Sequence, residues 1–380
     1  MTTASASVRK IVYLSGTRAD FGLMQSTLLA LAKVADVSIL VTGMHLQAAF
    51  GATLSAVLAT GLRVCGKVPM DVTTRSKASM ARGVGQCMMG VTDCLAAEKP
   101  DLLLVMGDRG EMLAGALAAL HLGIVCVHVH GGERSGTVDE PVRHAISKLS
   151  TYHLVATEQS KSRLIRMGED PSRIEVTGAP GLDGLHAVVL PADQLKQTIG
   201  LPDNRPFLLA LFHPVVQQAD EAYEQTVSVL RALKSVDLPV LWLDPNADAG
   251  SGEVLRALDA VSLPGESHRA RHLDRSIFCS AMQHCSVMVG NSSAGIIEAA
   301  TFGTPVVNVG DRQRLRERND NVTDVAAEAG AILVAIRAAL TTGRLPTANR
   351  YGDGLAGPRI VECLIRLPIG SVVLEKVNSY

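Results

Sequence analysis

The chain has 380 residues, of which 47% are hydrophobic, 19% are charged and only 3% are aromatic. Its 36 Lys and Arg residues almost balance its 37 Asp and Glu residues, so the formal net charge is −1. This length predicts roughly two domains, and the apolar content excludes a disordered protein. Without a strong charge bias, neither nucleic acid nor a membrane surface is expected as a partner.

Seven cysteines are scattered along the chain without a C-x-x-C pair. This pattern predicts reduced thiols and a cytoplasmic location. The N-terminal segment contains too short an apolar run for a signal peptide. The segment from Met112 to Val129 is as long as a membrane span, but His121 and Gly123 divide it. We therefore interpret it as a buried helix that leads into a buried strand.

Short aliphatic runs alternate with helix-length segments along the chain. The expected strands are 10–15, 37–43, 101–107, 123–130, 152–158, 174–178, 206–212, 239–244, 285–290 and 305–310. Helix-length segments between them include 22–35, 111–122 and 221–236. This alternation predicts an α/β protein with two Rossmann-like, doubly wound domains built on parallel sheets.

The boundary between the two halves is expected within residues 178–204, which contain Ala-Pro-Gly, two Leu-Pro steps and little strand signal. We predict an N-terminal sugar-binding and catalytic domain over residues 1–180. A C-terminal nucleotide-binding domain is expected over 181–355, and the last segment, 356–380, is expected to pack back on the N-terminal domain. Ligands of such folds bind in the cleft where strand ends of both halves meet.

Four polar clusters directly follow predicted strands: GTRAD at 16–20, GDRGE at 107–111, HPV at 213–215 and GNSS at 290–293. The carboxyl ends of strands are where α/β folds bind their ligands. One such cluster could be turn chemistry alone, but four in one chain indicate a shared site.

The GNSS cluster has two interpretations. Ser292 or Ser293 could simply cap a helix that begins near Ala294. Alternatively, the free backbone N–H groups of this small-residue turn bind a phosphate. Glu298 favours the second interpretation, because a carboxylate among Ile and Ala residues needs a partner. A ribose diol would supply two donors, whereas an arginine from 311–318 would make a structural ion pair.

The candidates of the N-terminal half are titratable groups at strand ends. Asp108 precedes Glu111 by three residues, so it is either a catalytic carboxylate or part of a capping box. In HVHGGERSGTVDEPVRHA, residues 128–145, His128 and His130 lie two apart on an expected strand and so face the same side. This cluster favours acid/base chemistry, with pKa values pushed apart, over a metal site.

Together these segments resemble the hydrolysing UDP-N-acetylglucosamine 2-epimerase family. The motifs are GTRADFGLM, VTGMHL, MGDRGEML, HVHGGERSGTVDEPVRHAISKLS, TGAPGLD, FHPV, DPNADAGS and GNSSAGIIEAATFGTPVVNVGDRQ, in this order. The resemblance implies a fold like the two-domain glycosyltransferase B type, with a cleft between the domains. It also implies conversion of a nucleotide-linked N-acetyl sugar and water into the free 2-epimer and a nucleotide diphosphate, by elimination to a glycal and hydration.

Carried over to matching positions, the resemblance assigns Asp108, Glu133 and Asp139 to acid/base chemistry. Many members have glutamate at position 130, so either His130 or Glu133 could be a proton carrier here. The remaining assignments are contacts with the nucleotide or the substrate: Arg18, His45, Arg109, His213, Ser292, Ser293, Glu298 and Arg312. Among these, Glu298 is the ribose contact. The chemistry implies no metal and no other cofactor.

The resemblance leaves the sugar and the nucleotide open. The substrate is expected to be UDP-N-acetylglucosamine or a 2,4-diacetamido-trideoxy sugar on UDP or GDP, and the product a precursor of sialic or legionaminic acid. A non-hydrolysing 2-epimerase and a catalytically idle nucleotide-sugar sensor are the alternatives. An apolar helix surface in the first half favours a homodimer.

Overall fold

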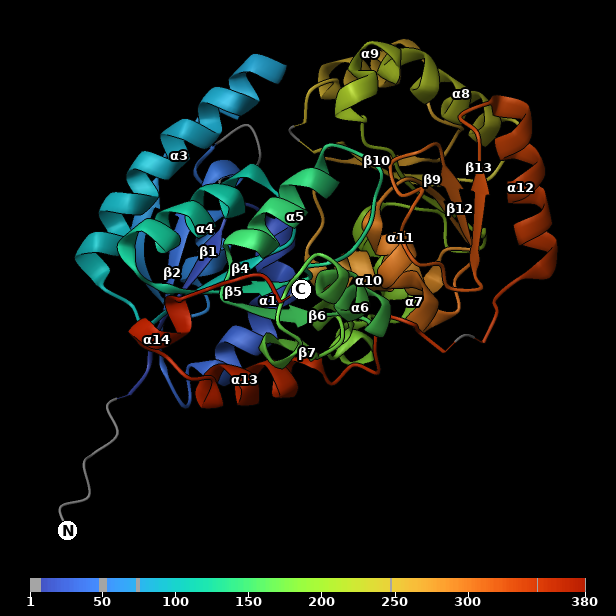
Figure 1. Ribbon diagram of the computed structural model, residues 1–380. Helices are drawn as coiled ribbons and strands as arrows, with labels where there is room; N and C mark the ends of the chain where they lie inside the picture. The colour runs from blue at the N-terminus through green and yellow to red at the C-terminus, as the bar shows by residue number, and fades with distance from the viewer. Residues whose placement is uncertain (1–7, 48–52, 73–75, 247, 347, 380) are drawn as a thin grey trace.

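The computed structural model describes residues 8–379 apart from 48–52, 73–75, 247 and 347. The first seven residues of the predicted N-terminal domain and Ala247 of the DPNADAGS motif therefore lie outside the described residues. The chain forms two parallel sheets, which lie side by side in Figure 1, with helices on both faces of each. The expected fold class, two Rossmann-like domains, is confirmed.

The N-terminal sheet has seven strands. Their spatial order is β3 (Arg63–Val68), β2 (Asp36–Thr42), β1 (Lys10–Ser15), β4 (Leu102–Met106), β5 (Val125–Val129), β6 (Tyr152–Val155) and β7 (Ile174–Val176). All neighbours are parallel. The strand order reverses between β1 and β4, which creates a crevice at their carboxyl ends.

The C-terminal sheet repeats this arrangement with six strands. Their order is β10 (His268–Ala270), β9 (Val240–Leu243), β8 (Leu208–Leu211), β11 (Val287–Gly290), β12 (Val306–Val309) and β13 (Val322–Val325). These pairs are also parallel. Here the order reverses between β8 and β11, so each domain has one switch point at which a ligand can bind.

Helices bury an aliphatic core on each face of both sheets. The helices of the N-terminal half are α1 (Arg18–Leu31), α2 (Leu54–Leu58), α3 (Lys77–Glu98), α4 (Gly110–Leu122), α5 (Asp139–Leu149) and α6 (Glu158–Arg166). Those of the C-terminal half are α7 (Ala192–Ile199), α8 (Ala222–Lys234), α9 (Ser251–Ala260), α10 (Arg275–His284), α11 (Ser293–Ile297) and α12 (Ala329–Thr342). Short 3-10 turns η1 (Gly43–Leu46), η3 (Pro171–Arg173), η4 (Pro180–Leu182), η5 (Leu185–Val188), η6 (Val216–Glu221) and η7 (Ala299–Phe302) complete them.

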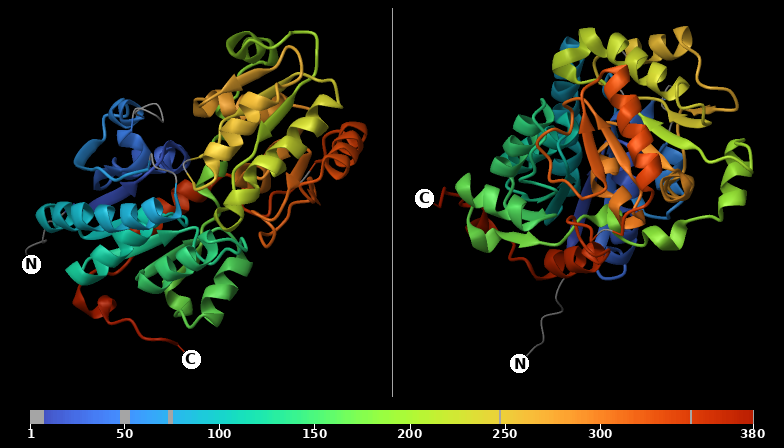
Figure 2. Two further views of the ribbon diagram at one scale, coloured as in Figure 1. Left: turned by 90° about the horizontal axis from the view of Figure 1, so that it is seen from above. Right: turned by 90° about the vertical axis from the view of Figure 1, so that its right-hand side faces the viewer.

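The C-terminal segment returns to the first domain. Helix α13 (Ala356–Arg366) packs against α1, and both Ile360 and Leu364 are fully buried in the core beneath the N-terminal sheet. Figure 1 shows α13 and α14 (Ser371–Leu374) in red against the blue and green domain, and Figure 2 shows the same contact from two other sides. None of the helices in the described ranges is both long and apolar enough to span a membrane.

Three strands were not predicted: β3, β10 and β13. All three lie at sheet edges, and their sequences, RVCGKV, HRA and VTDV, mix polar with apolar residues. An edge strand pairs on one side only and can expose its polar side chains, so it lacks the continuous apolar run of a central parallel strand. Helix α7, also unpredicted, lies within the expected connection, where Leu195 and Ile199 join the C-terminal core.

Candidate active site

The polar clusters lie at the two switch points and face each other between the domains. Arg18 and Asp108 follow β1 and β4, while His213 and Asn291 follow β8 and β11. Arg18 is the first residue of α1, whose N-cap Thr17 forms a capping box. A narrow pocket has walls from both domains, formed by Thr137, Val138, Asp139, Pro214, Val215, Val216, Asp248 and Arg312.

Ion pairs connect the two domains across this cleft. Arg316 of the C-terminal domain contacts Glu133 directly, and its Nη2 lies 3.6 Å from Asp108 Oδ2. Arg312 Nη2 lies 4.0 Å from Asp139 Oδ2. Further out, Arg18 pairs with Asp274, and Arg109 Nη1 lies 3.8 Å from Asp248 Oδ1. Near Asp108 the N-terminal domain therefore presents carboxylates to guanidinium groups of the C-terminal domain, whereas at Arg18 and Arg109 it supplies the cations. Guanidinium groups of both domains thus line the cleft, and such groups bind diphosphates.

Asp108 lies between two arginines. Arg143, with only 1% of its surface exposed, donates to the Asp108 carboxylate from one side, and Arg316 approaches from the other. Burial alone would raise the pKa of Asp108, but these two cations lower it below its ordinary value. The capping-box alternative for Asp108 is wrong, because Arg109 is the N-cap of α4 and has no side-chain cap bond.

Glu133 and His130 form a second buried group. His130 Nδ1 lies 2.7 Å from Glu133 Oε1, and Arg143 Nη1 donates to the Glu133 carbonyl oxygen at 3.0 Å. Burial opposes ionisation of Glu133, yet Arg316 and His130 hold its pKa well below the usual range. His130 has a φ of 64°, a left-handed conformation that is uncommon outside glycine. This backbone turn directs the imidazole toward Glu133 rather than along the strand.

His128 has a different environment from His130. Its Nε2 lies 2.7 Å from the carbonyl oxygen of Gly107, and its Nδ1 lies 3.0 Å from Ser147 Oγ. Burial lowers the pKa of His128 to about 3, so the ring is neutral. The expected alternation does not extend to His130, because β5 ends at Val129. His128 thus contacts Gly107, the residue before Asp108, and is not part of the charged cluster.

Asp139 is the first residue of α5, and its pKa is shifted in the opposite direction to that of Asp108. Burial and the negative charge of Asp108 raise the pKa of Asp139, although Arg312 partly offsets them. The two neighbouring carboxylates therefore have pKa values displaced in opposite directions, and their roles as acid and base stay a prediction.

The GNSS turn is fixed by close contact between β8 and β11. A Cβ atom on Gly290, whose φ is 136°, would lie 1.8 Å from the carbonyl oxygen of Leu211. Asn291 accepts a hydrogen bond from His213 N at 2.7 Å and donates to His213 O at 2.8 Å. The Asn291 carbonyl oxygen in turn accepts from Arg312 Nη1 at 3.3 Å. Asn291 therefore holds His213 and Arg312 together.

Ser292 is the N-cap of the five-residue helix α11 and accepts from Ala294 N at 3.3 Å. Both Ser292 and Ser293 are partly exposed. Glu298 ends this helix and is only 5% exposed. Its Oε2 lies 2.6 Å from Arg275 Nη1 of α10, so the structural ion pair considered as the alternative for Glu298 exists, but Arg275 makes it and not an arginine from 311–318.

The two other predicted histidines are fully or largely enclosed. Burial, together with Arg312 and Arg109, lowers the pKa of His213 to about 3. His45 is fully buried, and both of its ring nitrogens lie 2.8 Å from protein hydroxyls, those of Ser15 and Thr53. A substrate contact by His45 stays a prediction and would require one of these bonds to open.

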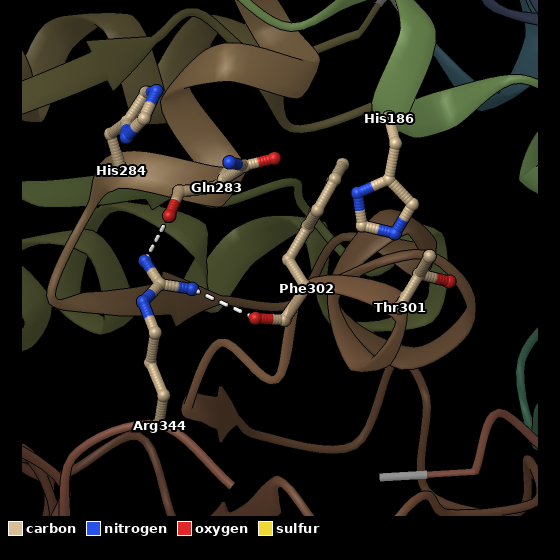
Figure 3. Close-up of a pocket in the computed structure, with 6 residues that line it drawn as sticks. All are labelled: His186, Gln283, His284, Thr301, Phe302 and Arg344. Carbon is tan, nitrogen blue, oxygen red and sulfur yellow. Dashed lines mark hydrogen bonds between the residues drawn. The ribbon is translucent and has the colours of Figure 1, made fainter. Parts of the chain in front are cut away.

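A further pocket of about 310 Å³ lies in the C-terminal domain, lined by His186, Gln283, His284, Thr301, Phe302 and Arg344 (Figure 3). The guanidinium group of Arg344 already has hydrogen-bond partners within the protein. Arg344 donates to the carbonyl oxygens of Gln283, Cys285 and Phe302 and to Thr304 Oγ1. The guanidinium group therefore connects backbone segments with its Nη1 and Nη2 donors, which leaves only the Nε–H donor for a ligand. Within the described ranges, no group of three His, Cys, Asp or Glu side chains is arranged to hold a metal.

Two Rossmann-like domains whose switch points face each other across a charged cleft define a protein of the glycosyltransferase B class. The chain belongs to the UDP-N-acetylglucosamine 2-epimerase family, whose model matches residues 29–365. It is 46% identical over 376 residues to the UDP-N,N'-diacetylbacillosamine 2-epimerase (hydrolyzing) of Legionella pneumophila, covering 98% of this chain and 100% of that protein.

Two more distant proteins are also similar to this chain, one in sequence and one in fold. The UDP-N-acetylglucosamine 2-epimerase of Neisseria meningitidis is 32% identical over 352 residues, 91% of this chain and 92% of that protein. The structure of Methanocaldococcus jannaschii UDP-GlcNAc 2-epimerase in complex with UDP-GlcNAc and UDP superposes with a TM-score of 0.79. It is 20% identical and covers 94% of this chain and 99% of that chain, so it supports the fold alone. The family resemblance drawn from the sequence motifs is confirmed.

Sequence reasoning missed three arginines of the site: Arg143, Arg275 and Arg316. Arg143 and Arg316 were visible only as members of charged stretches, and Arg275 was not singled out. The acids that they contact lie far away in the chain: Asp108 is 35 residues from Arg143, and Glu133 is 183 residues from Arg316. No local spacing rule reports such pairs.

Proposed function

We propose that this protein is a hydrolysing nucleotide-sugar 2-epimerase that releases a free 2-epimer and UDP. The observation that carries the proposal is the cross-domain cluster in which Arg316 contacts Glu133 and approaches Asp108. Such a cluster combines proton-carrying acids with cations that stabilise a departing diphosphate, as elimination of a nucleotide requires. The 46% identical relative bears the name of this reaction on a diacetamido sugar.

The nucleotide is assigned to the C-terminal switch point. Ser292, Ser293 and Arg312 would contact the diphosphate, with His213 beside them and Arg18 and Arg109 reaching in from the first domain. Glu298 would accept the hydroxyls of the ribose. This last assignment is supported by the nearly complete burial of Glu298, whose carboxylate Arg275 contacts through Oε2, which leaves Oε1 for a hydroxyl.

The carboxylates of the first domain would act on the sugar ring. Asp108, which two arginines hold ionised, would remove the proton from the carbon that bears the acetamido group as the bond to the diphosphate breaks. Asp139, whose pKa is raised, would return a proton when water adds to the glycal. The His130–Glu133 pair lies beside these groups, and we assign it to proton transfer with the hydroxyls or the incoming water.

The substrate that we propose is a UDP-linked 2,4-diacetamido-trideoxy sugar, with UDP-N-acetylglucosamine as the second choice. The support is the substrate named for the 46% identical relative, compared with that of the 32% identical one. The product would then supply the synthesis of a legionaminic-type nonulosonic acid in the cytoplasm.

The test is release of nucleotide diphosphate from three substrates: the diacetamido sugar on UDP, the same sugar on GDP, and UDP-N-acetylglucosamine. We expect the highest kcat/KM for the first. Conversion without UDP release would establish a non-hydrolysing epimerase, and tight binding without turnover of any sugar would establish a sensor. Either result would contradict the proposal.

We further propose that the protein acts as a homodimer. The proposal is supported by apolar side chains on the outer helices of the first domain, with Met89 of α3 67% exposed and Leu120 of α4 46% exposed. Light scattering coupled to size-exclusion chromatography should give twice the mass of one chain, and Met89→Glu should lower the measured mass. A monomeric wild-type protein would contradict this part of the proposal.

A further inference from the structure

Arg275 is placed to control the carboxylate that we assign to the ribose. It is the first residue of α10, and its guanidinium group has two partners. Nη1 lies 2.6 Å from Glu298 Oε2, and Nη2 donates to the carbonyl oxygen of Gly181 at 2.6 Å. The arginine side chain is 28% exposed, whereas that of Glu298 is 7% exposed. The carboxylate is thus the more deeply buried member of the pair.

The geometry of this pair leaves the carboxylate open to a ligand. An ionised carboxylate offers about four acceptor sites, and a vicinal diol offers two O–H donors. Arg275 supplies the positive charge that a nearly buried carboxylate requires, through a contact of 2.6 Å between its Nη1 and Glu298 Oε2. Arg275 therefore lies on one oxygen of the carboxylate, Oε2, and leaves the other, Oε1, for hydroxyl donors.

Gly181 connects the pair to the junction between the domains. It belongs to η4, which packs against α1 of the first domain. A Cβ atom on Gly181 would lie 2.5 Å from Leu23 Cδ2 and 3.8 Å from Glu298 Cδ. The backbone at Gly181 thus passes between Leu23 of one domain and Glu298 of the other. By donating to this backbone, Arg275 fixes the distance between the carboxylate and the interdomain segment.

We infer that Arg275 is a positioning residue that sets the Glu298 carboxylate for the 2′- and 3′-hydroxyls of the nucleotide, and that selectivity for ribonucleotides over 2′-deoxyribonucleotides depends on it. This inference rests on the proposed function, because it takes Glu298 as the ribose contact. It adds a residue that does not touch the ligand itself but determines whether the ligand's sugar is recognised.

The test is a comparison of the affinities of UDP and 2′-deoxy-UDP, measured by calorimetry. The wild-type protein should bind UDP roughly 10- to 100-fold more tightly, which is the value of a hydrogen bond to a charged acceptor. Glu298→Gln should reduce this ratio toward one. Arg275→Met should do the same, mainly by weakening UDP, while Arg275→Lys should restore part of the ratio because it keeps the charge.

Arg256→Met is the matched control, because Arg256 pairs with Glu253 on the exposed surface of α9 and should leave the ratio unchanged. Arg275→Gln provides a second neutral variant should the methionine variant unfold. A wild-type ratio in Arg275→Met, even with both affinities lowered equally, would overturn the inference and leave the function standing. Failure of the wild-type protein to bind UDP would instead overturn the proposed function and this inference with it.

Discussion

Replacing Arg316 with methionine removes the cation that joins the domains at the acid cluster. Its Nη2 lies 3.6 Å from Asp108 Oδ2. At this distance, two unit charges interact by about 5 kcal/mol with an effective dielectric constant of about 20. Because Arg143 remains on the other side of Asp108, the net effect will be smaller. We expect the pKa of Asp108 to rise by about one to two pH units, within the range that a neighbouring cation produces.

The assay is the pH profile of kcat/KM, which reports the ionisation of the free enzyme. If Asp108 must be ionised to accept a proton, the acidic limb moves to higher pH in Arg316→Met. Arg316→Lys should move it less, since the charge is kept. Arg314→Met is the control, because Arg314 is exposed and has no ion pair among the described residues. An unmoved limb, or an equal movement in the control, would refute the assignment of Asp108 as the base.

The same cations determine how the stability of the folded protein changes with pH. The folded-state pKa values of Asp108 and Glu133 are lowered, so their contribution is present above their ordinary pKa values of about 4 and is lost as the pH falls through the folded-state values. The wild-type protein should therefore lose thermal stability as the pH is lowered from about 5, and Arg316→Met should lose less over the same interval. A steeper loss in the variant would contradict this account.

Four further predictions concern separate parts of the chain. Asp108→Asn should retain UDP binding but lose turnover, whereas Glu298→Ala should weaken UDP binding roughly tenfold or more; equal loss of binding in both would contradict the division of labour. Gly290→Ala should lower the unfolding free energy by at least about 3 kcal/mol through its clash with the Leu211 carbonyl. Gly85 lies in helix α3, and a Cβ atom added there would have nothing within 4 Å. Gly85→Ala should therefore raise the unfolding free energy by about 0.5–1 kcal/mol. Thermal melts that show stabilisation by Gly290→Ala and destabilisation by Gly85→Ala would refute both predictions. Lys376→Met should lower the unfolding free energy by about 1–3 kcal/mol, because Lys376 Nζ donates to three carbonyl oxygens at the end of α5 and pairs with Glu169. An unchanged melting temperature would contradict this prediction.

The sequence was sufficient for the central strands and for the strand-end positions of the site. Parallel strands buried on both faces require continuous apolar runs, so β1, β4, β8 and β11 stand out, and the polar residues after them mark the switch points. The edge strands β3, β10 and β13 were missed because partial exposure relaxes that requirement. Helix α1 begins at Arg18, within GTRAD and before the expected start at residue 22, because Thr17 and Asp20 form its capping box.

Pairings across the cleft could not be predicted in the same way. The sequence indicated that Glu298 needs a partner, but whether an arginine from 311–318 or Arg275 is closest depends on how α10 packs beside α11. Similarly, His128 and His130 look equivalent by alternation, and only the end of β5 at Val129 separates a supporting histidine from one in the acid cluster. Such distinctions depend on tertiary packing, which residue spacing does not encode.

We propose that the diphosphate leaves from the C-terminal domain while carboxylates of the N-terminal domain move the proton at the neighbouring carbon. The most direct measurement is NMR of the reaction of the UDP-linked diacetamido sugar in D2O. We predict UDP together with a free sugar of inverted configuration at carbon 2 that carries one deuterium there. A released sugar that keeps the original configuration and the original hydrogen at that carbon would contradict the claim.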